Sequence, residues 1–344
     1  MKIFSDYLID NLANSGAPVL TGYELGLIIL NILNEGIHTP AGTQGSIYSL
    51  DLESFSKKKF SYALDKIVHP VLSPNYEIRS ATPIDFSFNP DILPQTIPEL
   101  ISKIIHELRG IVPQDVDFQR PGSFRYNVYK NLYAKDCSES DVACIVDPSA
   151  YVSHLSAMYQ YGLTNRIPNR LFITIAGRKM WDEHFLGEIK KRYQPLETLG
   201  IEVKRINIPN TLRGTPVNIF ASDKLEISPP RTIDGYRRVC SVGRCFLDML
   251  RQPDLCGGIP HVVESISENF SYFGEDMIKE IDRFGTGADK IRAGYILENI
   301  LNTYHPILDK WVKYAKPGGS RKLNPSKPYN RNNINEKWML SFNE

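Results

Sequence analysis

The sequence predicts an α+β protein that begins with a winged helix-turn-helix, continues into a mixed α/β domain and ends in a helical portion. Helical periodicity in the first seventy residues, followed by two short extended pieces, predicts the first part. Short apolar runs that alternate with amphipathic segments predict the second, and a succession of amphipathic segments predicts the third. The expected parts are 1–80, a proline-rich connector with a short helix at 81–123, the α/β domain at 124–240 and the helical portion with a basic loop and a terminal strand at 241–344.

Helices are predicted over 2–14, 22–34 and 54–68, where apolar residues recur at helical spacing. Thr21 followed by Glu24 is typical of a capping box at the start of the second helix. The loop at 37–50 is longer than the usual turn between two such helices. Residues 71–80 form two short extended pieces around a Ser-Pro-Asn turn, which together would make the wing.

The rest of the chain follows the same logic. Prolines interrupt residues 81–98, and a short helix is expected over 97–110. Strands are expected over 125–133, 171–175, 201–208, 218–221 and 225–227, and helices over 153–162 and 181–193. Later helices are expected over 243–252, 261–270, 275–285 and 290–304, then an exposed loop over 316–335 and a short strand over 337–342.

Composition excludes several classes of protein. Apolar residues make up 42% of the chain and charged residues 23%, which excludes a mainly disordered or fibrous chain. The net charge is +1, so any binding to nucleic acid must come from local patches. The 5 cysteines include no C-x-x-C pair, which disfavours a zinc ribbon or a redox dithiol. No signal peptide or membrane-spanning run is visible, so we expect a cytoplasmic protein with reduced thiols.

Motifs of catalysis are largely missing. The sequence contains no G-x-S-x-G, no P-loop and no histidine pair with metal-ligand spacing, so we expect no catalytic residue, metal or cofactor. His154 beside Ser153 could act as a general base, although a packed histidine is the simpler interpretation. A second alternative is an Mg²⁺-dependent nuclease of the restriction type, which would use Glu202 and Lys204 on a strand with Asp182 upstream.

Candidate DNA-binding residues lie on the third predicted helix and the wing. In a helix-turn-helix protein this helix enters the major groove, where lysines neutralise phosphates and polar side chains contact base edges. The candidates are Lys57, Lys58, Lys59, Ser61, Tyr62 and Lys66 on the helix and Asn75, Tyr76 and Arg79 on the wing. Residues 1–80 carry six basic and eight acidic residues, which leaves open a protein-interaction module that does not bind DNA.

A second basic group lies near the C-terminus. Residues 309–337 carry eight Lys and Arg residues against two acidic ones. This segment would hold phosphates or an acidic partner, or it is simply a solvated loop. The candidates are Lys313, Lys316, Arg321, Lys322, Lys327 and Arg331.

Four segments resemble one known family. Residues 147–175 (DPSAYVSHLSAMYQYGLTNRIPNRLFITI) resemble the start of the C-terminal domain of AbiEi-type proteins. Residues 242–266 resemble that family's helix with Leu-Asp-x-Leu, Pro and Gly-Gly, and residues 292–300 its Arg-x-Gly-Tyr-x-x-Glu helix. The closing KWMLSFN resembles its terminal strand, so the similarity extends over roughly 124–344. The family commonly has a His before Gly-Leu-Thr, where this chain has Tyr161.

The resemblance implies a function. AbiEi-type proteins are antitoxins and transcriptional regulators of type IV toxin–antitoxin systems linked to abortive phage infection. Such a protein would bind inverted repeats in double-stranded operator DNA and repress its own operon. Its functional partner would be a nucleotidyltransferase-like toxin, with no direct contact required.

Overall fold

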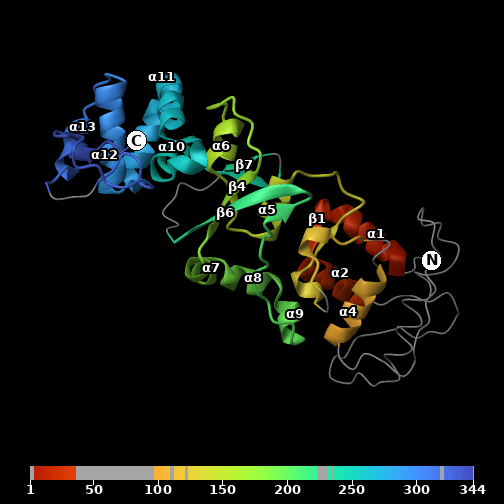
Figure 1. Cartoon of the computed structure of the whole chain (residues 1–344). Coiled ribbons are helices and arrows are strands. Elements are labelled where there is room, and N and C mark those ends of the chain that lie inside the picture. Colours follow the sequence, from red (N-terminus) through yellow and green to blue (C-terminus); the bar gives the residue numbers. More distant parts are fainter. Residues whose placement is uncertain are drawn as a thin grey trace, which may run out of the picture. The chain divides into compact units, whose positions relative to one another are not determined.

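A computed structural model describes residues 4–35, 97–108, 112–120, 123–223, 231–233, 235–317 and 321–343 (Figure 1). The chain divides into two compact units. Unit 1 contains Met1–Ser138, Ile145–Asp147 and Asp182–Pro209, and unit 2 contains Glu139–Cys144, Pro148–Trp181 and Asn210–Glu344. No helix among the described residues is long and apolar enough to cross a membrane.

Unit 1 begins with a helix, a strand and a second helix. These are α1 (Phe4–Ser15), β1 (Val19–Thr21) and α2 (Gly22–Glu35), which confirms the two helices predicted here. The expected capping box is present, because the Thr21 backbone N–H donates to the Glu24 carboxylate at 2.8 Å. The Glu24 N–H donates in return to Thr21 Oγ1 at 3.2 Å, so the start of α2 is satisfied locally.

The later part of unit 1 adds a helix and a strand. The helix α4 (Ile97–Glu107) confirms the short helix expected in the connector, and β2 (Val128–Lys130) is all that forms of the strand expected over 125–133. The 3₁₀ turns at Val116–Phe118 and Phe124–Tyr126 lie between them. Residues 124–126 form a turn and not a strand. The Asn127 N–H donates to the Phe124 carbonyl at 3.1 Å and stabilises this turn.

Short strands in unit 1 form one small sheet around β2. β1 pairs with β2 in antiparallel register, with Val19 opposite Lys130. On the other edge of β2, Gln114 bridges to Tyr129 in the antiparallel sense. The Asp115 N–H donates to the Val128 carbonyl at 3.0 Å and the Lys130 N–H to Pro113 at 2.9 Å. The order is therefore β1, β2 and then residues 113–115.

Residues 182–209 also belong to unit 1. They contain α8 (Leu186–Arg192) and α9 (Gln194–Thr198). Arg192 forms an ion pair with Glu24 at 2.8 Å, and the rings of Tyr193 and Tyr23 lie 5.4 Å apart. The Lys204 N–H donates to the Tyr23 hydroxyl at 3.0 Å. Burial raises the pKa of the Tyr23 hydroxyl, as expected for a phenol that packs under this segment.

The strand predicted over 201–208 is wrong. Residues 201–209 form no strand, although Ile201, Val203, Ile206 and Ile208 are buried in alternation. Alternating burial normally indicates a half-buried strand. Here the apolar side chains are buried within unit 1 while the backbone pairs with no neighbouring strand.

Unit 2 contains a mixed sheet of 6 strands in the order β5-β6-β4-β3-β8-β7. The strands are β3 (Tyr151–Val152), β4 (Leu171–Ala176), β5 (Thr211–Leu212), β6 (Thr215–Ser222), β7 (Arg231–Ile233) and β8 (Arg237–Val239). β4 runs parallel to β6, β3 parallel to β8, and the other pairs are antiparallel. The predicted strands at 171–175 and 218–221 and the mixed α+β class are thereby confirmed, and 225–227 lies outside the described residues.

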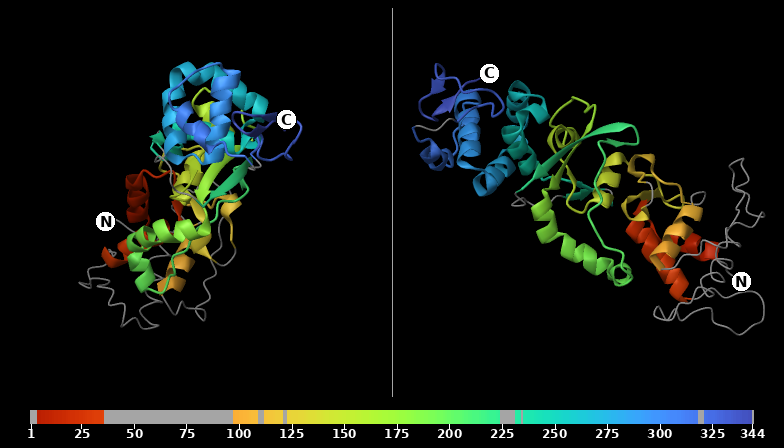
Figure 2. Two further views of the ribbon diagram at one scale, coloured as in Figure 1. Left: turned by 90° about the vertical axis from the view of Figure 1, so that its left-hand side faces the viewer. Right: turned by 60° about the horizontal axis from the view of Figure 1, so that its bottom comes forward.

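Helices complete unit 2, and α10, α11 and α12 gather together beside the sheet (Figures 1 and 2). They are α6 (His154–Gln160), α10 (Val242–Arg251), α11 (Ile259–Phe284), α12 (Gly287–Tyr295) and α13 (Leu308–Trp311). Two helices cross the division between the units, α5 (Glu139–Val146) and α7 (Arg178–His184). The single helix predicted over 181–193 is split between α7 and α8.

The helices predicted over 261–270 and 275–285 form one helix, α11. Gly274 is the only helix breaker between them, and a glycine inside a helix costs about 1 kcal/mol relative to alanine. Burial of the apolar stripe of α11 in the unit 2 core outweighs that cost. Further along, the predicted terminal strand shortens to β10 (Leu340–Ser341), which pairs with β9 (Ile334–Asn335).

Candidate nucleic-acid interface

The helix α4 presents one apolar and one polar face. Ile101, Ile104, Ile105 and Leu108 recur at helical spacing and are all buried. This stripe lies close to α2 beside Gly26. A Cβ at that position would lie 3.7 Å from the Ile101 side chain. The opposite face of α4 carries the exposed residues Glu99 and His106 and the half-buried Ser102.

Residues 115–120 and 123–127, here called the 115–127 turn, lie between the bridged residue Gln114 and β2. The Asp115 carboxylate accepts from the Asp117 N–H at 3.1 Å, which begins the turn. At the other end the Asn127 side-chain oxygen accepts from the Arg120 N–H at 2.8 Å. The Arg120 guanidinium is exposed and lies 5.2 Å from the centre of the Tyr126 ring. These hydrogen bonds stabilise the backbone of the turn, on which the Arg120 side chain is exposed.

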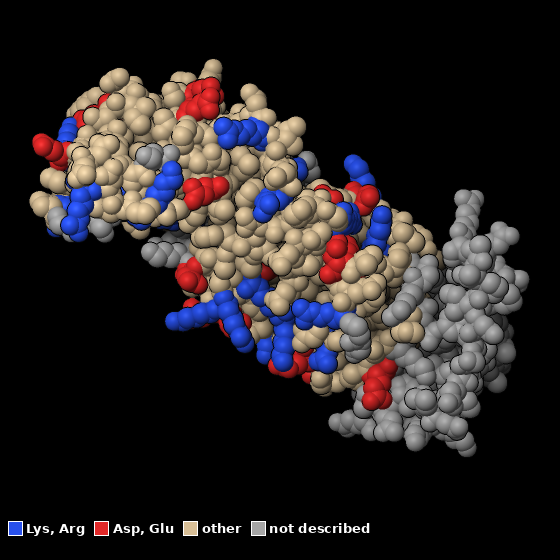
Figure 3. Space-filling view, in the orientation of Figure 1, with Lys and Arg blue, Asp and Glu red and all other residues tan. Residues whose placement is uncertain are grey.

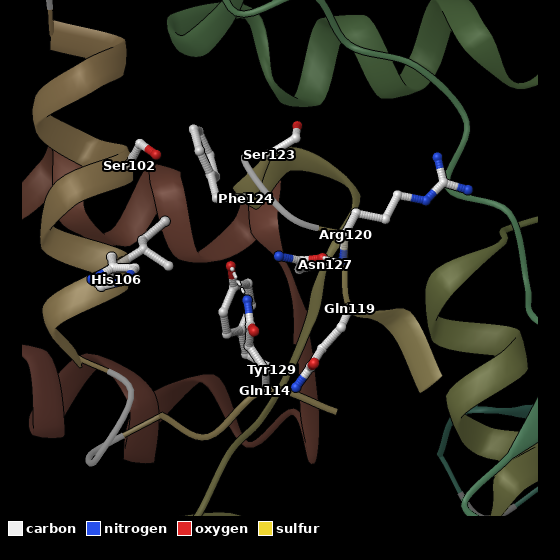
Figure 4. A pocket seen from close by; sticks show the side chains of 10 residues that line it. Ser102, His106, Gln114, Gln119, Arg120, Ser123, Phe124, Asn127 and Tyr129 are labelled. Carbon is white, nitrogen blue, oxygen red and sulfur yellow. Dashed lines mark hydrogen bonds between the residues drawn. The ribbon is translucent and has the colours of Figure 1, made fainter. Parts of the chain in front are cut away.

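A hollow lies between α4 and this turn, and we call it the α4 hollow (Figure 4). Its volume is about 210 Å³, below the 300 Å³ or more that is typical of small-molecule sites. Figure 4 shows the α4 side chains Ser102 and His106 on one side and Gln119 and Arg120 on the other. The full lining is Ser102, Ile105, His106, Gln114, Gln119, Arg120, Ser123, Phe124, Asn127 and Tyr129.

The lining of the α4 hollow combines polar side chains with a larger apolar surface and carries few charges. Gln114 donates to the Tyr129 hydroxyl at 3.4 Å across its base. The Ser123 hydroxyl is buried and has no hydrogen-bond partner within the part of the chain that the structure describes. Amides, hydroxyls and an imidazole are the groups that hydrogen-bond to base edges and phosphates in protein–DNA contacts. The hollow is therefore suited to contacting an edge of a nucleic acid rather than enclosing a ligand.

Basic residues flank this region within unit 1. A second hollow, lined in part by Ser102, Ser123 and Arg125, adjoins the first. Arg125 and Lys190 lie close enough to Glu202 to act electrostatically on its carboxylate, and the pKa of that group is lowered, chiefly by a hydrogen bond from Lys204. Figure 3 shows Lys and Arg side chains gathered over α7 and α8, and the last turn of α8 contributes Lys190, Lys191 and Arg192.

The DNA-binding residues expected from the sequence cannot be compared with this geometry. All of them fall between residues 36 and 96, outside the described residues. They are Lys57, Lys58, Lys59, Ser61, Tyr62, Lys66, Asn75, Tyr76 and Arg79. Their assignment stays a prediction.

The C-terminal basic residues come together only in part. Arg321 donates to the Lys316 carbonyl at 3.0 Å, and Lys322 donates to the Lys327 carbonyl at 2.7 Å. Two of the cations are therefore used to hold the loop closed, and Arg321 and Lys322 are only half-exposed. Lys313, Lys316, Lys327 and Arg331 are exposed.

The nuclease triplet has a different arrangement from the one that the motif requires. Glu202 and Lys204 form an ion pair with each other at 2.7 Å, and both are more than half exposed. They lie on a segment without strand structure, and Asp182 lies exposed on α7. Across the described ranges, no three His, Cys, Asp or Glu side chains are grouped so that they could hold a metal ion.

Unit 2 contains a buried polar group that the sequence reasoning missed. Arg244 and Asp248 form an ion pair at 2.8 Å inside α10, and they are only 3% and 2% exposed. The Tyr151 hydroxyl and His154 Nε2 are buried and have no hydrogen-bond partner among the described residues. Burial raises the pKa of the Tyr151 hydroxyl, with the Asp248 carboxylate as the next cause. An arginine one turn before an aspartate in an apolar helix was the available signal.

His154 is packed rather than placed as a solvent-exposed base. Its side chain is 1% exposed, and Nδ1 lies 2.8 Å from the Ser153 hydroxyl. The backbone has a φ of 49°, which is uncommon for a residue with a side chain. Burial lowers the pKa of its imidazole, and the nearby Asp248 only partly opposes that effect.

A pH dependence follows from the buried imidazole. The pKa of the His154 imidazole is lower in the folded protein than in the unfolded chain, where it is about 6.5, so the unfolded chain binds the proton first and unit 2 loses stability as the pH falls through that value. The loss from this residue is at most about 1.4 kcal/mol per pH unit. In His154→Asn, which keeps a residue that tolerates positive φ, the loss between pH 7.5 and pH 5.5 should be smaller. Urea unfolding followed by tryptophan fluorescence measures the free energy of unfolding at each pH. An equal loss of stability in the wild type and in His154→Asn would contradict the assignment of this pH dependence to His154.

Comparison with known proteins does not identify a relative: no family model matches this chain, and no curated protein does. The sequence analysis does not predict the α4 hollow, because prolines precede α4 and indicate a connector there. The available signal is the apolar stripe of Ile101, Ile104, Ile105 and Leu108, which the structure shows to be buried.

Proposed function

We propose that this protein is a DNA-binding transcriptional repressor that acts as the antitoxin of a type IV toxin–antitoxin system. One observation carries the DNA-binding part of the proposal, namely the order of elements in unit 1. In the described part of unit 1, α1, β1 and α2 come first, and α4 and β2 follow after residues 36–96, which lie outside the described residues. β2 lies between β1 and the bridged residues 113–115. A last helix followed by two paired extended segments is consistent with a winged helix-turn-helix, whose wing joins those segments.

The charges around unit 1 are consistent with contact to phosphates. Arg120 is exposed on the 115–127 turn. Arg125, Lys190 and Lys204 lie near Glu202 in the same unit, and the first of these three adds to the positive charge while Lys204 is paired with Glu202. Because the whole chain is close to neutral, such local groups would supply the attraction to DNA. The exposed polar groups of unit 1 would then contact base edges in the operator.

The segments that carry the resemblance to AbiEi-type proteins support the antitoxin part. They are in contact within unit 2, where the Ser265 hydroxyl donates to the Leu163 carbonyl at 2.9 Å. Thr164 Oγ1 and His261 Nε2 lie 2.8 Å apart. If the sequence resemblance reflects the same fold as in AbiEi-type proteins, hydrogen bonds between the resembling segments are expected. The implied partner is a nucleotidyltransferase-like toxin, which need not form a complex with this chain.

A gel-shift titration of the full chain tests the repressor. The probes are the DNA upstream of its own coding sequence and a shuffled fragment of the same length and composition. We expect the upstream DNA to bind at least about a hundredfold more tightly, with an affinity that falls steeply as salt is raised. Equal affinity for both fragments at every salt concentration would contradict the proposal and would favour an interaction module that does not recognise DNA sequence.

Growth after co-expression tests the antitoxin. A neighbouring nucleotidyltransferase-like gene, expressed alone, should arrest growth, and this chain should restore it. A toxin with an inactivated transferase site serves as the control for expression load. Arrest that persists in the presence of the chain would contradict the antitoxin part while leaving the repressor part to the gel-shift result.

A further inference from the structure

Two helices compete for the role of reading helix in the proposed DNA-binding unit. The sequence pattern favours the helix expected over 54–68, which lies outside the described residues. The structure provides a second candidate, α4, whose place in the chain is different. Which of them contacts the operator can be argued from connectivity, packing and surface chemistry.

Connectivity favours α4. In a winged helix-turn-helix, the reading helix directly precedes the two strands that flank the wing. α4 is followed by one extended segment and one strand in this position, since the Val112 N–H donates to the Leu108 carbonyl at 2.8 Å and residues 113–115 then bridge to β2. The helix expected over 54–68 would be separated from these strands by the whole of α4.

Packing also favours α4. Its buried stripe packs against α2, where Ile101 and the Phe124 ring lie beside Gly26. The second and third helices of a helix-turn-helix pack in this way, so that one face of the third stays open to the major groove. The open face of α4 carries Ser102 and His106, which border the α4 hollow opposite the 115–127 turn (Figure 4).

We propose that α4 is the helix that reads operator DNA and that the 115–127 turn is the wing, an inference that rests on the proposed function. Ser102 and His106 contact base edges in the major groove, and Arg120 contacts a phosphate of the strand that passes over the α4 hollow. Glu99, exposed at the start of α4, repels phosphates but can accept from the amino group of a cytosine. On this proposal, operator reading does not require Lys57, Lys58 and Lys59.

Substitutions on the two sides of the hollow separate reading from phosphate contact. Ser102→Ala with His106→Ala should lower the preference for operator over shuffled DNA about tenfold and leave the salt dependence unchanged. Arg120→Ala should weaken binding to both DNAs several-fold and reduce the slope of log affinity against log salt by about one. The side chains of Arg120 and His106 are exposed, so these changes should preserve the fold, which circular dichroism checks.

Two further variants make the outcomes distinguishable. Lys279→Ala on α11 is the charge-matched control, because its side chain is 74% exposed in unit 2, and it should bind as the wild type does. A triple Lys57→Ala, Lys58→Ala, Lys59→Ala variant tests the competing helix and should also bind as the wild type does. If this triple variant loses operator preference while the α4 variants keep it, the inference is wrong and the proposed repressor stands. If the wild type shows no preference, the proposed function itself fails.

Discussion

Replacing Asp248 with asparagine should destabilise unit 2 by about 3–5 kcal/mol, the usual cost of leaving one charge of a buried ion pair without its partner. The pair with Arg244 spans one turn of α10, and both side chains are almost fully buried. Asparagine is close to aspartate in shape, so the loss of stability would come from the missing negative charge and not from a cavity. Trp181, Trp311 and Trp338 all lie in unit 2, so urea unfolding followed by tryptophan fluorescence measures it.

Two variants control this experiment. Arg244→Met with Asp248→Leu removes both charges and should recover most of the lost stability, since an apolar pair of similar volume replaces a buried ion pair at little cost. Lys279→Ala removes a partner of the exposed i,i+4 pair with Glu275 and should change stability by less than about 0.5 kcal/mol. A single Asp248→Asn variant as stable as the wild type would show that the pair is solvated in solution.

A methyl group at Gly22 should destabilise unit 1 by about 3 kcal/mol, at the upper end of overpacking costs. A Cβ at this position would lie 1.9 Å from the Phe124 carbonyl oxygen, which is backbone and cannot rotate away. The Gly22 N–H also donates to the Asn127 carbonyl at 2.9 Å, so the start of α2 and the 115–127 turn are held together here. Hydrogen exchange of peptides from α1, α2 and β2 measures Gly22→Ala, because unit 1 contains no tryptophan.

Gly26→Ala is the matched control on the same helix. Its Cβ would meet the nearest atoms, in the Phe124 ring, Leu196 and Ile101, at 3.4 Å or more, which is ordinary van der Waals contact. Alanine is favoured over glycine inside a helix, so this variant should be stabilised by about 0.5–1 kcal/mol. If both alanines slow or both speed exchange alike, helix propensity rather than the contact with the turn decides the effect at Gly22.

Elements with strong local signals could be predicted from the sequence. The Thr21–Glu24 box began α2 as expected, because a capping box is satisfied by residues three positions apart. β4 formed where a run of apolar residues predicted a buried strand. Such signals are carried by neighbours in the chain and are little affected by what packs later.

Elements that depend on distant partners were predicted poorly. Residues 201–208 have the alternation of a strand but no strand beside them, and they join unit 1 through Tyr23, far away in the sequence. The two helices expected around Gly274 are one, since tertiary burial outweighs the cost of one glycine. A local pattern cannot show whether a pairing edge or a core will be available to it.

The candidate site divides in the same way. The sequence by itself predicted that α4 is a short helix, because helix formation depends on neighbouring residues. Only the tertiary structure decided that its polar face borders a hollow opposite Arg120, because the pairing of residues 113–115 with β2 carries the 115–127 turn there. Backbone pairing joins residues that are distant in the sequence. Which segment pairs with β2 therefore depends on how the whole unit packs and not on the neighbouring residues in the chain.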